Sequence, residues 1–367
     1  MVTGDSRIES REGNRLTDVP GIAVGHYHRL DDDVVLATID DPGEGWATGT
    51  TVIRLPAGSA TAVDVRGGGP GTRETDLLDP VNTVRGADAI VLTGGSAFGL
   101  AAADGVMLGL EESGTGLPMD GQGHVVPIVP AAVIFDLPVG RWENRPTAEF
   151  GRRALDAATI EFDVGSVGAG VGARAGALKG GVGTASVTVR EGPARGLTVG
   201  ALVVANPVGG VIDPTTGLPW GSDDLDVHRL RTPTQLEVKR LAELTAKGTV
   251  LNTTIGVVAT DATLSVAGTK RLAMAGHDGL ARAVRPAHSP LDGDTLFGVA
   301  TGERTVAPDD AVDVPPGMDP DTAIVTALCE VSATVVQRAI VSAVVTATSV
   351  AGIPAYRDLL VSAFGPR

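Results

Sequence analysis

Residues 250–261 read VLNTTIGVVATD, in which Asn252, Thr253 and Thr254 stand near the head of a run of small and β-branched residues. β-Branched side chains favour extended backbone, so we expect a buried strand over residues 250–260. Thr and Asn are also frequent at ordinary strand entrances. The stretch therefore indicates a buried sheet, but by itself it indicates no function.

A second polar segment stands at the head of another apolar run. Residues 290–297 read PLDGDTLF and place Asp292 and Asp294 directly before the apolar residues. An Asp-Gly-Asp sequence alone is typical of a turn or of a cation-binding loop. Polar residues thus stand directly before two expected strands, at 252–254 and at 292–294. This favours the hypothesis that the two segments form one functional site.

Outward from these segments, short apolar runs alternate with longer helical patterns. Most of the runs are apolar on both faces, which is typical of strands covered by another layer on each side. The pattern predicts a layered α/β protein. The expected strands are residues 51–55, 89–92, 131–136, 197–205, 250–260 and 295–301. The expected helices, several with Ser, Thr or Asp as N-cap, are residues 99–113, 147–158, 234–247, 265–284, 321–348 and 354–364.

The composition narrows the class of protein. The chain has 367 residues, of which 43% are hydrophobic, only 3% are aromatic and 50 are glycine, so its core must form from small aliphatic side chains and close backbones. A formal charge of -15 without a Lys/Arg run argues against a nucleic-acid partner. The single cysteine, Cys329, excludes an intramolecular disulfide, and its neighbours predict a buried helix rather than a nucleophile. Two stretches rich in Pro and Asp are expected to be surface loops, residues 213–226 and 303–320.

Two segments bear on whether the protein is secreted or inserted in a membrane: the N-terminal segment and the most apolar segment. Residues 1–14 are polar and lack an apolar signal segment, so we expect a loose, flexible tail. Residues 324–350 contain Glu330, Gln337 and Arg338, so we expect no membrane-spanning helix. These expectations describe a cytoplasmic protein with no membrane partner.

Three other motifs have ordinary structural interpretations. Residues 66–72 (RGGGPGT) lack the Gly-Lys-Ser/Thr of a phosphate loop and predict a tight turn. Ser96 in GGSAFG resembles a nucleophile elbow, but Phe98 stands where an elbow needs a small residue, so a helix N-cap beside a cleft is expected. The histidines show no metal-ligand spacing, so no metal is expected. A Ser–His–Asp triad built on His277 or His288 stays open.

Several segments together resemble the self-processing peptidase family that includes the DmpA-type aminopeptidases, the β-aminopeptidases and the nylon-oligomer (aminohexanoate oligomer) hydrolases. The resemblance implies a four-layer α/β/β/α sandwich of the DmpA and ornithine-acetyltransferase type. It implies a single hydrolase domain over residues 15–367 that cuts itself into fragments 1–252 and 253–367, and a homo-oligomer, expected to be a tetramer. The segments that carry it are RLTDVPGIAVGH, AVDVRGGGPGTRETDLL, LTGGSAFGL, ALVVANPVGGVID, NTTIGVVATD and HSPLDGDTLF, in this order.

The resemblance also implies site residues. The positions that match the family's nucleophile, its oxyanion-binding asparagine, its lysine and its acidic pair are Thr253, Asn206, Lys179, Asp292 and Asp294. Asn252 matches the residue before the scissile bond. Phe135 stands where several relatives have a tyrosine, so the hydroxyl donor of that tyrosine is absent here. Phe135 and the turn of Gly94, Gly95 and Ser96 are the expected substrate-binding residues.

The implied chemistry uses one residue twice. The Thr253 hydroxyl attacks the Asn252 carbonyl, and hydrolysis of the resulting ester frees an α-amine beside the hydroxyl. An α-amine has a reference pKa of about 7.7–8.0 and can act as the base for its own side chain, without a metal or an organic cofactor. Asn206 and backbone N–H groups are the expected oxyanion donors, and Lys179 is expected to support the oxyanion or the proton transfers. Asp292 and Asp294 are expected to orient the ammonium or the hydroxyl, or to bind the free amine of a small peptide or amide substrate.

Other functions remain open on the sequence. The first is a nylon-oligomer endohydrolase, and the second is acyl transfer of the ornithine acetyltransferase kind. The third is an unprocessed binding scaffold without catalysis. A separate alternative concerns one residue: Lys179 is only a solvated loop residue and takes no part in catalysis. A thiol-based or metal-based enzyme has the least support.

Overall fold

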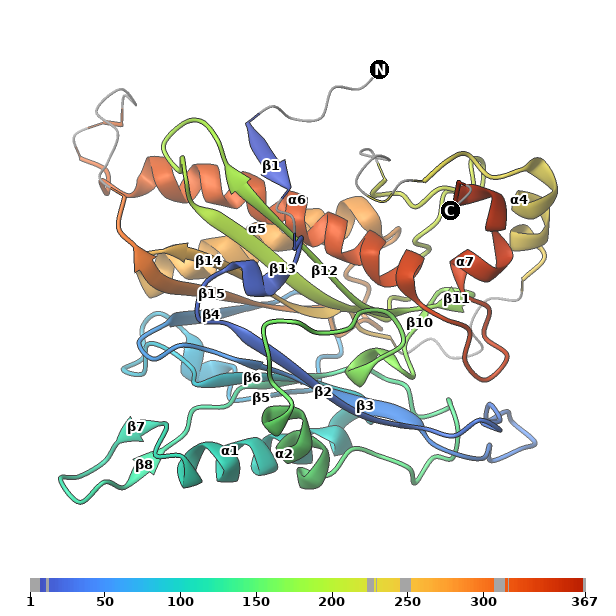
Figure 1. The fold of residues 1–367 in the computed structure, drawn as a ribbon, viewed down its shortest axis with the longest axis horizontal. Coiled ribbons are helices and arrows are strands. Elements are labelled where there is room, and N and C mark those ends of the chain that lie inside the picture. The colour runs from blue at the N-terminus through green and yellow to red at the C-terminus, as the bar shows by residue number, and fades with distance from the viewer. Residues whose placement is uncertain are drawn as a thin grey trace.

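The protein is described by a computed structural model, which covers residues 7–10, 13–222, 228, 230–244, 252–306, 314–315 and 317–365. Two β-sheets lie face to face, and each is covered on its outer face by helices (Figure 1). The layers follow the order α, β, β, α. The four-layer sandwich implied by the family resemblance is confirmed.

The larger sheet has six strands in the order β1-β12-β13-β14-β15-β4. All its neighbours are antiparallel except β14 and β15. A parallel pair needs a long crossover, and helix α5 (Val266–Ala283) provides it between these two strands. The strands are β1 (Ile8–Ser10), β4 (Ala60–Val65), β12 (Gly181–Val189), β13 (Thr198–Ala205), β14 (Ile255–Ala262) and β15 (Thr295–Arg304).

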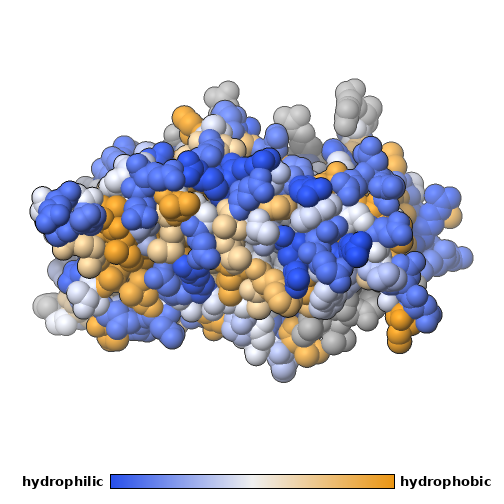
Figure 2. All heavy atoms as spheres, turned by 90° about the horizontal axis from the view of Figure 1, so that it is seen from below, coloured by the Kyte–Doolittle hydropathy of each residue, from blue (hydrophilic) through white to orange (hydrophobic). Residues whose placement is uncertain are grey.

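The second sheet has five strands in the order β2-β3-β6-β9-β5. Its parallel pair, β6 and β9, is joined through helix α1 (Ala102–Glu112), which packs with α2 (Ala148–Asp156) on the outer face of the sheet. Seen from this helical side, the surface is mostly hydrophilic with scattered apolar side chains (Figure 2). The strands are β2 (Ala23–Leu30), β3 (Ala47–Arg54), β5 (Thr72–Arg73), β6 (Ala89–Thr93) and β9 (Ala131–Val133).

The inner strands are buried on both faces, as the apolar runs predicted. In β13, Leu202 and Val204 pack in the core between the sheets, whereas Ala201 and Val203 pack beneath the helices α5 and α6 (Thr322–Thr346). This division follows from the two-residue repeat of a strand, which sends alternate side chains to opposite faces.

Small residues let the layers approach closely. A Cβ added at Gly183 of β12 would lie 2.1 Å from the carbonyl oxygen of Ala339 in α6, and one added at Gly279 of α5 would lie 2.0 Å from that of Ala333. Backbone therefore meets backbone at these crossings. This explains how a chain so rich in glycine and so poor in aromatic residues fills its core.

Helix α6 is buried in this packing. Among the described residues it alone is long and apolar enough to cross a membrane, with a mean hydropathy of 1.6 over its most apolar window. Yet 67% of that window is buried inside the fold, which is the position of a core helix. The remaining elements are β7 (Leu117–Pro118), β8 (Val125–Val126), β10 (Arg174–Ala175), β11 (Leu178–Lys179), α4 (Gln235–Ala242) and α7 (Tyr356–Leu359).

The structure corrects several sequence-based boundaries. The expected strand over residues 250–260 begins at Ile255, and residues 250–251 lie outside the described part, as does the end of the helix expected over residues 234–247. The strand expected over residues 131–136 ends at Val133 because Phe135 and Asp136 turn into the site described below.

Three of the longer strands, β2, β4 and β12, escaped prediction, and the expected loose tail is wrong for Ile8–Ser10. β4 and β12 are rich in Gly, Ala and Thr, and β2 carries His26, His28 and Arg29, so none of the three has a strong apolar pattern. Ile8–Ser10 forms the edge strand β1, because β12 offers it backbone partners from Val187 to Val189. An edge strand gains ladder hydrogen bonds even where its own side chains are polar.

Candidate active site

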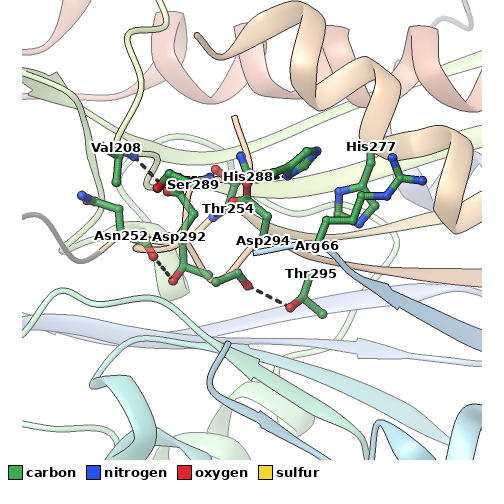
Figure 3. A network of polar contacts seen from close by, with 12 residues as sticks. Arg66, Val208, Asn252, Thr254, His277, His288, Ser289, Asp292, Asp294 and Thr295 are labelled. Atoms are coloured by element: carbon green, nitrogen blue, oxygen red, sulfur yellow. Dashed lines mark hydrogen bonds and ion pairs between the residues drawn. The ribbon is translucent and has the colours of Figure 1, made fainter. Parts of the chain in front are cut away.

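The two polar segments singled out in the sequence meet at one end of the larger sheet. β13 ends at Ala205 and continues into Asn206, while Thr253 and Thr254 directly precede β14. Because β14 and β15 are parallel, the residues that precede each strand, including Asn252 and Asp292, lie side by side (Figure 3). The hypothesis that the two strand heads form one site is supported by this placement.

Thr253 is buried and contacts the peptide group that precedes it. Its hydroxyl donates to the carbonyl oxygen of Asn252, and its backbone N–H donates to the carbonyl oxygen of Asn206 at 3.0 Å. The N–H of Gly293 donates to the same Asn252 carbonyl oxygen at 3.1 Å. The carbonyl before Thr253 is thus touched by a hydroxyl and polarised by a backbone donor.

Gly293 has room for no side chain. A Cβ at this position would lie 2.8 Å from Oγ1 of Thr253 and 2.9 Å from the carbonyl oxygen of Gly69. Contacts this short do not occur for real Cβ atoms. The glycine of the Asp-Gly-Asp sequence is therefore needed for its close approach to the threonine hydroxyl.

Asp294 holds the residue that follows Thr253. Its carboxylate is buried, and Oδ1 accepts the backbone N–H of Thr254 at 2.8 Å. Oδ2 accepts the backbone N–H of His288 at 3.1 Å and bonds to its ring Nδ1 at 2.8 Å. Asp294 therefore connects the strand head to the loop before β15.

Asp292 holds a different pair of segments. Oδ1 accepts the backbone N–H of Val208 at 3.2 Å, and Oδ2 accepts the backbone N–H and the hydroxyl of Ser289 at 3.1 and 2.7 Å. Both oxygens of each acidic residue are thus engaged by donors of the protein. The pair lies beside Thr253 as expected, but its described bonds run to backbone, His288 and Ser289, not to the threonine hydroxyl.

Asn206 links the two sheets. Its side-chain Oδ1 accepts the N–H of Arg174 at 2.8 Å, and its Nδ2 donates to the carbonyl oxygen of Phe135 at 3.4 Å. The second bond is long for an N–H···O contact. The ring of Phe135 packs edge-on against Trp142, with 6.3 Å between centroids. Asn206 thus carries an amide donor at the junction with the five-stranded sheet.

The Gly94–Ser96 turn is bonded to the residues on either side of Phe135, because the N–H of Ser96 donates to the carbonyl oxygen of Ile134 at 3.0 Å. The Asp136 carboxylate accepts the N–H of Gly95 at 2.6 Å and the hydroxyl of Thr48 at 2.6 Å. Gly95, with φ of +82°, is the N-cap of the 3-10 helix Ser96–Ala101, so the N-cap role expected for Ser96 is wrong by one residue. Gly95 takes this place because the chain turns there with a left-handed backbone.

Lys179 is fully buried. Its Nζ donates to the carbonyl oxygens of Gly170 and Gly180 at 2.7 and 2.9 Å. The solvated loop position, an alternative left open by the sequence, is wrong. Gly181, two residues on, pairs with Ala205, so Lys179 lies near the end of the strand that continues into Asn206.

The glycine-rich segment at residues 66–72 forms one wall of the site. The N–H of Gly69 donates to the carbonyl oxygen of Asp292 at 2.8 Å, and the N–H groups of Arg66 and Gly67 donate to that of Asp294 at 3.0 and 3.3 Å. The close backbone approach expected of these glycines is confirmed at Gly67 and Gly68, although the segment is a bend without a hydrogen-bonded turn. Its contact with the acidic segment could not be predicted. His288 and Ser289 were also missed as partners, although they directly precede the acidic segment.

The serine triad left open by the sequence does not form. His277 bonds through Nε2 to the carbonyl oxygen of Asp64 at 3.0 Å, and His288 bonds to Asp294. Among the described residues, neither ring forms a hydrogen bond with a serine hydroxyl. Within the described ranges no group of three or more His, Cys, Asp or Glu side chains is placed to hold a metal ion. Burial raises the pKa of the Cys329 thiol, which disfavours a thiolate nucleophile.

A hydroxyl that already touches a peptide carbonyl, inside an α/β/β/α sandwich, suits the hydrolysis of peptide or amide bonds. The chain belongs to peptidase family S58, whose model matches residues 14–357. It is therefore a hydrolase of peptide or amide bonds, and the family resemblance noted in the sequence is confirmed.

Relatives cover nearly the whole chain. An uncharacterised aminopeptidase of Mycobacterium tuberculosis is 56% identical over 356 residues, 96% of this chain and 99% of that protein. A 6-aminohexanoate-oligomer endohydrolase of a Kocuria species is 33% identical over 309 residues, 81% of this chain and 77% of that protein. Among solved structures, a β-aminopeptidase from a Burkholderia species has a TM-score of 0.68 at 25% identity, covering 96% of this chain and 94% of that one.

Proposed function

We propose that the chain is an autoproteolytic N-terminal-nucleophile amidohydrolase of the aminopeptidase kind, which hydrolyses short peptides or unusual amides through Thr253. One observation carries the proposal. The Thr253 hydroxyl contacts the Asn252 carbonyl while the Gly293 N–H donates to the same oxygen at 3.1 Å. A nucleophile and an oxyanion donor thus converge on one peptide bond of the chain itself.

The proposed self-cleavage would use this geometry. Oγ1 of Thr253 adds to the carbonyl carbon of Asn252, and the negative charge develops on the oxygen that Gly293 contacts. The C–N bond then breaks, the nitrogen takes up the hydroxyl proton, and an ester joins the two residues. Water hydrolyses the ester, which leaves a carboxylate on Asn252 and a free amine and hydroxyl on Thr253. The Asn206 carbonyl, already bonded to this nitrogen at 3.0 Å, keeps the new amine in place.

The same oxygen then acts on a substrate. The neutral α-amine of Thr253 accepts the hydroxyl proton as Oγ1 attacks a substrate amide, and the resulting ammonium gives that proton to the departing amine as the amide C–N bond breaks. Water then hydrolyses the acyl-enzyme ester and restores the free hydroxyl. The substrate carbonyl must occupy the position that the Asn252 carbonyl leaves, so the Gly293 N–H serves both reactions. We assign the Nδ2 of Asn206, which donates to the carbonyl oxygen of Phe135 at 3.4 Å, as a second donor to the oxyanion.

The acidic pair and Lys179 take supporting roles in this proposal. The oxygens of Asp292 and Asp294 are buried and engaged, so we assign them to positioning the strand heads rather than to binding the free amine of a substrate. Lys179 places a cation out of contact with water near Asn206, where it favours negative charge in the transition state. Phe135 and the Gly94–Ser96 turn form the side of the site that receives the substrate.

A second candidate function, hydrolysis of aminohexanoate oligomers, is favoured by the relative that is 33% identical. It uses the same nucleophile and differs only in the substrate. A panel of peptide amides, β-amino-acid amides and 6-aminohexanoate oligomers distinguishes the two. Adding a free amino acid as acceptor, with mass spectrometry of the products, separates hydrolysis from acyl transfer.

N-terminal sequencing of the purified protein tests the proposal. A denaturing gel should show two fragments, residues 1–252 and 253–367, and the second should begin at Thr253. Thr253→Ala should remain uncut and inactive, whereas Thr253→Ser, which keeps a hydroxyl, should be cut. A fully active protein that is still one chain would refute the mechanism and leave the non-catalytic scaffold or another nucleophile to be tested.

A further inference from the structure

His288 holds the carboxylate that positions the residue after the nucleophile. Both its backbone N–H and its ring Nδ1 bond to Oδ2 of Asp294, at 3.1 and 2.8 Å, while the other oxygen of Asp294 accepts the N–H of Thr254 (Figure 3). One residue therefore occupies one oxygen of the carboxylate with two donors. The other oxygen is left directed at the strand head.

The backbone of His288 is adapted to this contact. Its φ of +57° lies in the left-handed region, which L-residues other than Asn, Asp and His seldom adopt. In this conformation the backbone N–H and the ring of one residue point to the same carboxylate oxygen. The contact thus depends on an unusual backbone state as well as on the ring.

A second histidine, His277, packs against the ring of His288. His277 is fully buried in α5, and its ring packs edge-on to His288 with centroids 4.9 Å apart. Its Nε2 bonds to the carbonyl oxygen of Asp64, a residue of β4. Burial lowers the pKa of His277 to about 4, so near neutral pH it packs against His288 as an uncharged ring. The orientation of His288 is therefore supported by the helix layer.

We propose that His288 is a positioning residue which, through Asp294, holds the Thr253–Thr254 peptide in place for attack, both in self-cleavage and in hydrolysis. The proposal rests on the proposed function of Thr253. The described hydrogen bonds of His288 run to Asp294 and not to Thr253 or the Asn252 carbonyl, so we infer that it acts on the reaction through the carboxylate and the backbone that the carboxylate holds.

Two amide substitutions test which ring nitrogen matters. The side-chain nitrogen of His288→Asn corresponds to Nδ1 and can still donate to Asp294, and asparagine accepts the left-handed backbone. The amide of His288→Gln reaches instead to the position of Nε2. We expect His288→Asn to retain most of the rate of self-cleavage and of kcat. We expect His288→Gln and His288→Ala to lose at least tenfold in both, with KM changed less than threefold.

His124→Ala is the matched control. His124 also bonds to a carboxylate, that of Asp120 at 2.6 Å, but on the exposed connection between β7 and β8, far along the chain from the site. It should leave cleavage, kcat and KM unchanged. Thermal unfolding of every variant identifies those that fail to fold, and the Asn and Gln variants keep the comparison valid if His288→Ala does not fold.

Two outcomes overturn the proposal. One is His288→Gln, folded, with cleavage and kcat equal to wild type. The other is His288→Asn impaired more than His288→Gln. The proposed function is tested separately by Thr253→Ala: if that variant is cut or active, the nucleophile is wrong, whatever the His288 variants do.

Discussion

Two buried carboxylates perform the same physical task on the two sheets, with different expected consequences. Asp294, before β15, accepts the N–H of Thr254 at 2.8 Å, and Asp136, after β9, accepts the N–H of Gly95 at 2.6 Å. Each satisfies a backbone donor at the end of a strand, where the ladder no longer provides a partner. Asp294 holds the residue next to the proposed nucleophile, and Asp136 holds the Gly94–Ser96 turn.

The comparison indicates a division of labour between the sheets. The six-stranded sheet provides the hydroxyl, the peptide carbonyl and the Gly293 donor, whereas the five-stranded sheet provides the turn and the Phe135 side of the site. Asn206 joins the two through its amide. Changes on the first side should therefore affect the chemical step, and changes on the second side should affect substrate binding.

The largest effect is expected at Gly293. Gly293→Ala adds a methyl group that would lie 2.8 Å from the Thr253 hydroxyl oxygen, so the hydroxyl or the Asp-Gly-Asp segment must move and the contacts on the Asn252 carbonyl are lost. Loss of one oxyanion donor alone costs about 10²–10³ in rate, and displacing the nucleophile as well should bring the loss of self-cleavage to at least about 10³-fold. The fraction of uncut chain over time measures it.

Gly268→Ala in α5 is the control for this substitution, because its nearest neighbours would lie 3.4 Å away, in ordinary contact. It should be cut at the wild-type rate. Normal cleavage of Gly293→Ala would remove the Gly293 donor from the mechanism.

The next effect is expected at Asn206. Asn206→Asp keeps an oxygen to accept the N–H of Arg174 but removes the Nδ2 donor. If Nδ2 stabilises the oxyanion, kcat should fall about 10²-fold while KM changes little. Kinetics are normalised to the fraction of cut protein, and a variant with wild-type kcat would exclude this donor.

The carboxylate pair tests the comparison itself. In Asp294→Asn an NH₂ group must face either the N–H of Thr254 or the two donors of His288, so we expect self-cleavage and kcat to fall more than tenfold. In Asp136→Asn the NH₂ group can face the Thr48 hydroxyl, which accepts as well as donates. We expect that variant to raise KM by less than about tenfold and to change kcat little. If Asp294→Asn and Asp136→Asn both change kcat, or both change KM, the proposed division between a catalytic sheet and a substrate-binding sheet is wrong.

Acid should destabilise the six-stranded side through His277. Its pKa is lowered to about 4 by burial, below the unfolded value of about 6.5, so the folded protein binds fewer protons than the unfolded chain. The contribution of the neutral His277 ring to the free energy of unfolding is complete above pH 6.5 and is lost as the pH falls towards 4. The loss is on the order of 2–3 kcal/mol. Urea unfolding at pH 7 and pH 4.5 measures it. His277→Gln should show a smaller pH dependence, and an unchanged one would assign the acid sensitivity elsewhere.

Much of this could be predicted from the sequence, for identifiable reasons. Strands apolar on both faces predicted the layered fold, and the family motifs predicted Asn206, Thr253, Asp292 and Asp294, which do lie together. Their partners could not be predicted, because the N–H of Val208 and the carbonyl of Phe135 belong to backbone and leave no mark on residue type. β12 was missed because close packing against α6 requires glycines, which weaken a strand pattern. Self-cleavage, the tetramer and the cytoplasmic location stay predictions.

The strand order has one more consequence. β14 and β15 belong to the proposed fragment 253–367, yet they lie between β13 and β4, which belong to fragment 1–252. To separate, the two pieces would have to break two ladders at once and expose the cores on both faces of the sheet. The mature enzyme should therefore migrate as one particle in native electrophoresis and come apart only under denaturing conditions. The proposed cut would release an amine without loosening the protein that surrounds it.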